Sequence, residues 1–272
     1  NRLPIGEFNA LLGKFGLEKT WHSILATNLQ RMNREDLQYI FEEKEFKNVA
    51  IQRIDFLVGL TMGEISALYE YSLAFVDRKN RKQEGQFFTP DDVAQVMAKK
   101  TLTFPKNKTW LDPCAGVGNL SYWLVFAQDD PEDFLMHHLY LVDRDALALS
   151  IARYILATHF QKNEPRLYEK IAFRFIVADF LAAEDLPVYD FAILNPPYVN
   201  VEHDSRFETM EARDLYAYFL EKVIKTTRGF VSISPQTFTN GQKFRTLRRL
   251  ILERCQDVSV YCFDHVPDDL FG

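Results

Sequence analysis

Two patterns of hydrophobic and polar residues follow one another along the 272 residues of this chain. In residues 1–84 apolar residues recur at helical spacing. Examples are "NREDLQYIFEEKEF", where Asn33 would cap the helix, and "GEISALYEYSLAFV". No alternation typical of strands extends far in this part. The pattern therefore predicts a helical N-terminal region over residues 1–84.

In the rest of the chain, short apolar runs alternate with helical stretches. We expect strands at "TWLDPC", "HLYLVD", "AFRFIVADF", "YDFAILN", "GFVSISP" and "VSVYCFD". We expect helices at "NLSYWLVFAQ", "DALALSIARYILATHF", "LYAYFLEKVIKTT" and "FRTLRRLILERC". This alternation predicts an α/β domain over residues 85–272, with a mostly parallel, twisted sheet flanked by helices. Ligands of such sheets bind beyond the carboxyl ends of the strands, so the chemistry is expected there.

Composition excludes several classes of protein. Hydrophobic residues make up 47% of the chain, enough for a sizeable core, but no apolar run is long enough to span a membrane and no secretion signal is visible. The three cysteines are too scattered for a disulfide framework or a zinc site, which favours reduced thiols in a cytosol. His137 and His138 are adjacent, so their side chains diverge, and no metal site is expected.

The net charge of −6 argues against a broad surface for nucleic acid. Two short basic runs stand out against it, and solvated helix faces explain most runs of this kind. The first run comprises Arg78, Lys79, Arg81 and Lys82, and the second Lys243, Arg245, Arg248, Arg249 and Arg254.

Glycines and an aspartate follow the first expected strand, in "LDPCAGVGNL". Gly116 and Gly118 allow a tight turn and a close backbone approach, and the next helix offers free amides at its start. Asp112 would repel a phosphate and favour a cation. The turn therefore indicates a ligand with positive charge, or it is structural only.

Acidic residues also end the next two expected strands. Asp143 can accept hydrogen bonds from the two hydroxyls of a ribose, with Asp145 as its alternative or as the cap of the following helix. Asp179 can accept a hydrogen bond from an exocyclic amine, while Phe180 packs on a ring. Each acid alone is typical of a cap or a turn, but together with the glycines they indicate a nucleoside site.

In this order, "GQFFTP", "DPCAGVG", "LVDRD", "VADF" and "NPPY" resemble the motifs of S-adenosylmethionine-dependent adenine-N6 DNA methyltransferases. The order is similar to the gamma arrangement of type I modification subunits and of type II and IIG modification enzymes. The resemblance implies a Rossmann-like class I methyltransferase fold, a prokaryotic cytoplasmic protein and a role in restriction-modification or a related defence system.

The resemblance also implies which residues bind the cofactor S-adenosylmethionine. "GQFFTP" would line a pocket at its methionine end, and Thr89 could also cap the following helix, with Pro90 in the first helical position. The complete set is Phe88, Thr89, Pro90, Asp112, Cys114, Gly116, Gly118, Asp143, Asp179, Phe180 and Asn195.

The catalytic group implied by the resemblance is Asn195, Pro196, Pro197 and Tyr198. The Asn195 side-chain oxygen and the Pro196 carbonyl would accept the N6 hydrogens of adenine and direct the nitrogen lone pair toward the methyl group, while the prolines fix the backbone. A duplex hides its adenine, so the base has to be flipped out of the stack. Tyr198 would stack on one face of this base, and Phe271, or alternatively Phe238, on the other.

Two alternatives remain beside methylation of DNA. The chain could methylate a protein glutamine or an RNA, since related motifs occur in such enzymes, or it could be a non-catalytic, cofactor-binding subunit of a modification complex. The sequence is also expected to stop before the last strand of the sheet and before any target recognition domain. Double-stranded DNA would then be bound with such a domain or with a specificity subunit.

Overall fold

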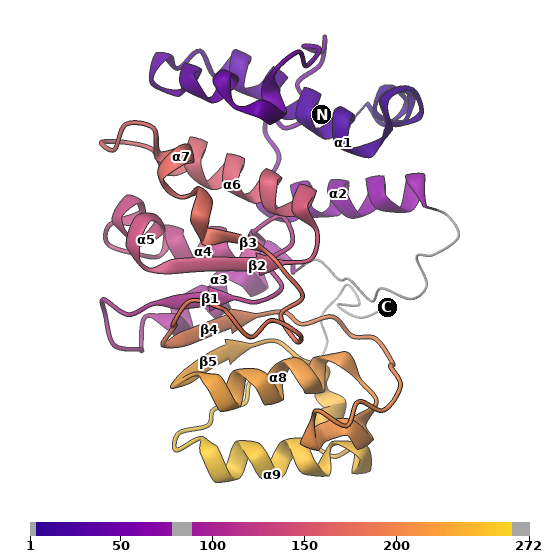
Figure 1. Cartoon of the computed structure of the whole chain (residues 1–272), viewed down its shortest axis with the longest axis vertical. Helices are drawn as coiled ribbons and strands as arrows, with labels where there is room; N and C mark the ends of the chain where they lie inside the picture. Colours follow the sequence, from indigo (N-terminus) through magenta and orange to yellow (C-terminus); the bar gives the residue numbers. More distant parts are fainter. Residues whose placement is uncertain (1–3, 78–88, 263–272) are drawn as a thin grey trace.

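The computed structural model describes residues 4–77 and 89–262, which Figure 1 draws in colour. The N-terminal part is helical, as predicted. Its elements are α1 (Ile5–Met32), the 3-10 helices η1 (Glu35–Glu42) and η2 (Lys44–Phe46), and α2 (Met62–Val76). A capping box formed by Thr61 and Glu64 starts α2.

The helix predicted to begin at Asn33 is wrong in its type and in its cap. Asn33 ends α1 in the left-handed conformation, with a φ of 50°, and the chain continues in the short 3-10 helices η1 and η2. Asparagine tolerates this conformation better than most residues, and a left-handed residue after a helix closes it. The same residue type therefore serves at either end of a helix, which the sequence pattern did not distinguish.

Five parallel strands form one sheet in the order β3-β2-β1-β4-β5. They are β1 (Trp110–Asp112), β2 (Leu139–Asp143), β3 (Phe175–Val177), β4 (Phe191–Leu194) and β5 (Gly229–Ser232). In Figure 1 they succeed one another along the long axis of the molecule, with α1 and α2 beyond β3 and with α8 and α9 beyond β5. The strand order reverses between β1 and β4, which is where such sheets bind ligands.

Helices cover both faces of the sheet, as predicted, because side chains along each strand alternate between two hydrophobic clusters. Trp110, Phe191 and Ile193 pack into the larger cluster, whereas Leu111 and Ala192 pack into the smaller one. The helices are α3 (Asp91–Thr101), α4 (Asn119–Phe126), α5 (Pro131–His137), α6 (Ala146–Phe160), α7 (Leu167–Lys170), α8 (Leu215–Thr226) and α9 (Arg245–Arg254). Short 3-10 helices η4 (Ala172–Arg174), η5 (Glu208–Ala212), η6 (Gln236–Phe238) and η7 (Gln242–Phe244) complete the fold.

The strand expected at "VSVYCFD" is wrong as far as residue 262, and its last two residues lie outside the described part of the chain. Val258, Val260 and Tyr261 are all about half exposed. The Tyr261 ring lies 4.0 Å from the Lys100 ammonium group, a contact typical of a surface segment. Alternating apolar residues predict a strand only where a neighbouring strand and a covering helix bury them.

The N-terminal helices share the core of the α/β part. The larger cluster includes Trp21 and Leu29 of α1 together with Tyr154 of α6 and Tyr168 of α7. Polar contacts join the same elements, such as the hydrogen bond of 2.8 Å that Tyr154 donates to Asn28. Within the described ranges, no helix is both long and apolar enough to cross a membrane.

Candidate active site

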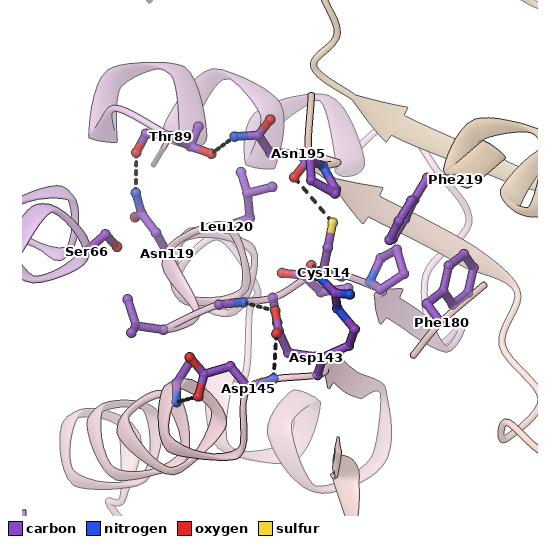
Figure 2. Close-up of a pocket in the computed structure, with 18 of the residues that line it drawn as sticks. Ser66, Thr89, Cys114, Asn119, Leu120, Asp143, Asp145, Phe180, Asn195 and Phe219 are labelled. Atoms are coloured by element: carbon purple, nitrogen blue, oxygen red, sulfur yellow. Dashed lines mark hydrogen bonds between the residues drawn. The ribbon is translucent and has the colours of Figure 1, made fainter. Parts of the chain in front are cut away.

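A pocket opens at the carboxyl ends of β1, β2 and β4, at the point where the strand order reverses (Figure 2). Residues from the α/β part and from α2 line it. Those expected from the sequence are Thr89, Asp112, Cys114, Gly116, Asp143, Asp179, Phe180, Asn195 and Pro197. The sheet therefore brings together residues that are separated by more than 100 positions in the sequence.

The glycine turn after β1 adopts the left-handed backbone conformation, which favours glycine. Gly116 has a φ of 54° and Gly118 a φ of 86°. A Cβ atom added at Gly118 would also lie 3.0 Å from the Cβ of Ala152 in α6. Gly118 is therefore required by both its φ and its neighbour, whereas Gly116 has a φ that favours glycine and lines the pocket as well.

Asp112 is buried at the end of β1. It accepts hydrogen bonds from the Ser121 hydroxyl at 2.9 Å and from the Cys114 amide at 3.4 Å. Burial raises the pKa of its carboxyl group to about 7, and these two hydrogen bonds only partly oppose that rise. Near neutral pH this carboxyl group can therefore change its charge, and a cation nearby would favour the charged form.

Asp143 and Asp145 divide two roles between them. Asp143 accepts hydrogen bonds from the amides of Gly116 at 2.8 Å and of Asp145 at 2.9 Å, and burial raises its pKa. Asp145 caps α6, as the alternative prediction had it, and its other oxygen accepts a hydrogen bond of 2.6 Å from the Tyr69 hydroxyl. Both carboxylates line the pocket, so the end of β2 presents two negative groups to a ligand.

Asp179 and Phe180 follow β3 and line the pocket, with Phe180 at the opposite end from Thr89 (Figure 2). The Asp179 carboxylate accepts a hydrogen bond of 3.0 Å from the Leu181 amide. Asp179 therefore stabilises the turn after β3, which is one of the roles expected of an acid at this position. The Phe180 ring is buried, and its centroid lies 5.4 Å from that of Phe219 in α8. These two rings give the pocket an aromatic end that can pack against a flat ligand.

The Asn195 amide has a fixed orientation after β4. Its nitrogen donates a hydrogen bond of 2.9 Å to the Thr89 hydroxyl, and its side-chain oxygen accepts one of 2.6 Å from the Tyr198 hydroxyl. The Cys114 thiol donates to the Asn195 backbone carbonyl at 3.3 Å, which joins the ends of β1 and β4. Hydroxyl groups therefore hold the Asn195 side-chain amide at both of its ends.

Thr89 and Pro90 do not have the capping roles expected of them. Pro90 is itself the cap residue, α3 begins at Asp91, and the Thr89 side chain makes no capping hydrogen bond. The Thr89 hydroxyl instead binds Asn195, and its carbonyl accepts a hydrogen bond from the Asn119 side chain. Contacts with residues distant in sequence have replaced the local cap.

Tyr198 packs against the smaller hydrophobic cluster, edge to face with Tyr216 at 5.8 Å between ring centroids. Its hydroxyl lies close to two acceptors, the Asn195 side chain at 2.6 Å and the Ile233 carbonyl at 3.1 Å. Phe238 packs on the same cluster, and neither aromatic ring lines the pocket described above. Phe88 and Phe271 lie outside the residues that the structure describes.

Several residues that line the pocket were not predicted from the sequence. Ser66, Tyr69 and Glu70 come from α2, Asn119 and Leu120 from the start of α4, and Leu215 and Phe219 from α8. The α2 residues recur at helical spacing, which predicts a common face but not what that face contacts. Asn119 directly follows the glycine turn. Among these residues, this was the one position in the sequence that pointed to the pocket.

Most side chains of the second basic run form ion pairs or hydrogen bonds within the protein. Lys243 lies 3.7 Å from Asp214, Arg249 pairs with Glu208 at 2.9 Å, and Arg248 donates to backbone carbonyls at 2.7 and 2.8 Å. The first basic run lies outside the described residues. Within residues 4–77 and 89–262, no group of three or more His, Cys, Asp or Glu side chains could hold a metal ion.

Comparisons with known proteins agree with the resemblance seen in the motifs. Residues 137–267 match the family model described as Eco57I restriction-modification methylase. The type II methyltransferase M.PstI of Providencia stuartii is 25% identical over 224 residues, which cover 74% of this chain and 42% of that protein. The chain therefore spans about two fifths of this relative. The resemblance to restriction-modification methylases is confirmed.

Solved structures share the fold at low identity. The structure of a DrdV–DNA complex has a TM-score of 0.58 at 15% identity, covering 91% of this chain and 31% of that one. A class I S-adenosylmethionine-dependent methyltransferase from Listeria monocytogenes has a TM-score of 0.53 at 15% identity. The match covers 91% of this chain and 76% of that one. The predicted class I methyltransferase fold is confirmed.

Proposed function

We propose that this chain, similar to restriction-modification methylases, is the catalytic region of an adenine-N6 DNA methyltransferase that uses S-adenosylmethionine. The observation that carries the proposal is the oriented Asn195 amide, which lines the same pocket as Asp143 and Phe180. In this proposal residues 85–272 form the catalytic domain and residues 1–84 its helical N-terminal region.

The charges around the pocket suit a cationic cofactor. Among the described residues that line it, five carboxylates face one guanidinium group. They are Glu70, Asp112, Asp143, Asp145 and Asp179 against Arg144. A dinucleotide or a nucleoside triphosphate would bring several negative charges into this field, whereas S-adenosylmethionine carries a sulfonium and an ammonium group against one carboxylate.

The residues can be assigned to parts of the cofactor by their chemistry. Phe180 and Phe219 offer apolar ring faces for the adenine, and the Asp143 carboxylate can accept hydrogen bonds from the ribose hydroxyls. When bound, S-adenosylmethionine supplies a methyl group on a positively charged sulfur. The remaining work of the protein is to hold the accepting nitrogen in line with that methyl group.

Asn195 is suited to hold that nitrogen. Its side-chain amide is held by the Thr89 and Tyr198 hydroxyls, and the oxygen of this amide can accept a hydrogen bond from an exocyclic amine. With the Pro196 carbonyl as second acceptor, the bound amine nitrogen would become more tetrahedral, and its lone pair would point toward the methyl group. The nitrogen would gain the methyl group as the sulfur–methyl bond breaks, S-adenosylhomocysteine would leave, and the cationic nitrogen would then lose one proton to water. The contribution of Asn195 is one of position and electrostatics, so the reaction needs no strong base.

The substrate and setting belong to the proposal as well. A double-stranded DNA would present its adenine flipped out, at a cost of roughly a few kcal/mol. Stacking of the base on aromatic rings near Tyr198 would offset this cost by about 1–3 kcal/mol. We further propose a specificity subunit or a separate target recognition domain as the source of sequence specificity, and the prokaryotic cytoplasm as the location.

The test uses the full-length protein, unmethylated double-stranded DNA and S-adenosylmethionine carrying a labelled methyl group. Nucleosides released from the DNA are separated and analysed by mass spectrometry, and the modified positions are then sequenced. We expect the label in N6-methyladenine at one short sequence. Label in cytosine, in RNA or in polypeptide instead would replace this function by one of the alternatives.

Asn195→Ala separates the chemical step from cofactor binding. Loss of an amide that stabilises the reacting group lowers a rate by about 100-fold or more, and we expect at least this loss of methyl transfer. Cofactor affinity, measured by calorimetry, should change by less than about threefold because other groups provide most of the contacts. Asn163→Ala, an exposed asparagine remote from the pocket, is the matched control and should leave both quantities unchanged.

A further inference from the structure

Two polar atoms inside the pocket have no hydrogen-bond partner among the described residues. They are the Ser66 hydroxyl oxygen and the Asn119 side-chain oxygen. Both residues are only 6% exposed, so neither atom is compensated by bulk solvent. A buried polar group without a partner is costly and uncommon in folded proteins, and here two of them line one cavity.

The two atoms lie at one end of the pocket. Figure 2 shows Ser66 and Asn119 beside Thr89, with Phe180 and Phe219 at the opposite end and Asp143 between them. If the aromatic end holds the adenine and Asp143 the ribose, the Ser66 end receives the remaining part of S-adenosylmethionine. That part is an α-amino acid with an ammonium and a carboxylate group.

The orientation of Asn119 is fixed by its neighbour. Its side-chain nitrogen donates a hydrogen bond to the Thr89 carbonyl, so the unpartnered atom is the oxygen, which can only accept. An ammonium group is a donor and suits this oxygen. Asn119 therefore provides an acceptor on the wall of an acidic pocket.

The position of Ser66 is fixed by two anchors on α2, three residues away on either side. The Gly63 amide donates to both oxygens of Asp91 at 3.0 Å, and Tyr69 donates to Asp145 at 2.6 Å. Residues three positions apart are neighbours on the surface of a helix, so Ser66 lies between the two anchors and next to each of them. The face that carries Ser66 is thus held against the α/β part at two points of contact.

We propose that Ser66 and Asn119 bind the amino-acid end of S-adenosylmethionine, which makes the N-terminal helix α2 part of the cofactor site. The Ser66 hydroxyl donates to the carboxylate, and the Asn119 oxygen accepts from the ammonium group. This assignment rests on the proposed function and adds to it a residue from outside the motif-bearing part of the chain. One donor and one acceptor together match the two ends of an α-amino acid.

The experiment compares two ligands in the full-length protein and in its Ser66→Ala variant. S-adenosylhomocysteine retains the amino-acid end, whereas 5′-methylthioadenosine retains the adenosine and lacks that end. Affinities for both are measured by calorimetry. We expect Ser66→Ala to weaken S-adenosylhomocysteine about tenfold, as for a hydrogen bond to a charged group, and to leave methylthioadenosine unchanged.

Ligand-free stability provides a second readout. Ser66→Ala removes a hydroxyl that has no partner in the structure, so the midpoint of thermal unfolding without ligand should not fall. Ser72→Ala is the control on the same helix, because Ser72 accepts a hydrogen bond of 2.9 Å from buried Trp21. It should lower the unfolding midpoint and leave the ratio of the two affinities as in the unmodified protein.

The outcomes separate this assignment from the proposed function. Suppose that the unmodified protein binds both ligands and that Ser66→Ala lowers the two affinities equally, or lowers neither. The assignment of Ser66 is then wrong, while S-adenosylmethionine remains the proposed cofactor. If the unmodified protein binds neither ligand, the proposed cofactor is wrong, and the assignment is overturned with it.

Discussion

The Tyr198 hydroxyl carries one proton and lies near two acceptors, Asn195 and the Ile233 carbonyl. It can therefore orient the Asn195 oxygen and turn toward Ile233 when an amine hydrogen arrives. In the proposed reaction Tyr198 would therefore be a positioning residue through its hydroxyl, in addition to any stacking of its ring on the base.

Tyr198→Phe tests this role, because it removes the hydroxyl and keeps the ring. We expect the single-turnover rate of methyl transfer to fall by about tenfold, as for one neutral hydrogen bond, with DNA affinity nearly unchanged. Tyr216→Phe makes the same change on the neighbouring ring and should leave the rate within about twofold. An unchanged rate in Tyr198→Phe would remove the hydroxyl from the mechanism.

Asp112 predicts a pH dependence of cofactor binding. Burial raises the pKa of this carboxyl group to about 7, and a cation in the pocket favours its charged form. Affinity for S-adenosylmethionine should therefore rise between about pH 6 and pH 8 and level off above, with release of up to one proton. Calorimetry in buffers of different ionisation enthalpy measures that proton, and Asp112→Asn should flatten the profile.

The same group affects folding with the opposite sign. An aspartate in the unfolded chain loses its proton near pH 4, whereas Asp112 in the folded chain holds it to about pH 7. Between these values the folded state binds more protons, so the contribution of this group to stability is present at low pH and is lost as the pH rises toward 7. A measured gain in stability from Asp112 over this range would contradict the assigned pKa.

Among single residues, Asp143 and Asn195 were predictable because they stand at fixed places in recognisable motifs directly after apolar runs. Ser66 was not, because nothing local distinguishes it from other small residues on a helix. Thr89 was expected both in the pocket, which it lines, and in a local cap, which it does not form, because its partners Asn119 and Asn195 are 30 and 106 residues away in sequence.

Helix α2 depends on a close approach at Gly63. A Cβ atom there would lie 2.8 Å from an oxygen of Asp91, whose carboxylate is also held by Trp123 at 2.9 Å. The carboxylate therefore has little freedom to move aside. It also satisfies an amide in the first turn of α2, where helices have unpaired donors.

Gly63→Ala should displace α2. We expect a loss of stability of about 1–3 kcal/mol, typical of overpacking, and a several-fold loss of cofactor affinity because Ser66 and Tyr69 move with the helix. Gly13→Ala in α1 is the matched control, since nothing lies within 4 Å of its added Cβ atom and alanine favours helices. Thermal unfolding and calorimetry measure the two effects, and equal behaviour of the variants would contradict the anchoring role of Asp91.

Strands were predicted correctly from the sequence where their apolar residues are buried in the sheet, and wrongly where such residues remain exposed. The runs at β1, β2 and β4 are buried on both faces, so their strands were evident from sequence. Val258 and Val260 have the same pattern but remain exposed. Helix α5 was missed because it is short, and its end at His137 was taken as the approach to a strand.

The larger of the two hydrophobic clusters crosses the predicted boundary at residue 84. Phe46 packs near the rings of Tyr154 at 6.0 Å and of Tyr168 at 6.2 Å between centroids. Arg34 and Tyr39 add hydrogen bonds to Thr158 and Gln161 at the end of α6. The N-terminal helices therefore cover the α/β part and also line its pocket.

A chain lacking residues 1–77 tests this integration. Removal exposes several large side chains at about 1.5–3 kcal/mol each, so we expect a loss of more than about 5 kcal/mol or failure to fold. The unshortened chain should unfold in one transition when followed by calorimetry and by circular dichroism. A shortened chain that keeps the original unfolding midpoint would show that the core on the α/β side is self-sufficient.

The sequence by itself determined the class of fold, the strands β1 to β5, the helices α4, α6, α8 and α9, and the residues that follow each strand, because hydrophobic periodicity and turn residues are local properties. The tertiary structure decided which of those residues share a cavity, that Tyr198 binds Asn195, and that α2 supplies a wall of the pocket. Contacts between distant segments depend on how helix faces pack together, and a one-dimensional pattern does not specify that packing.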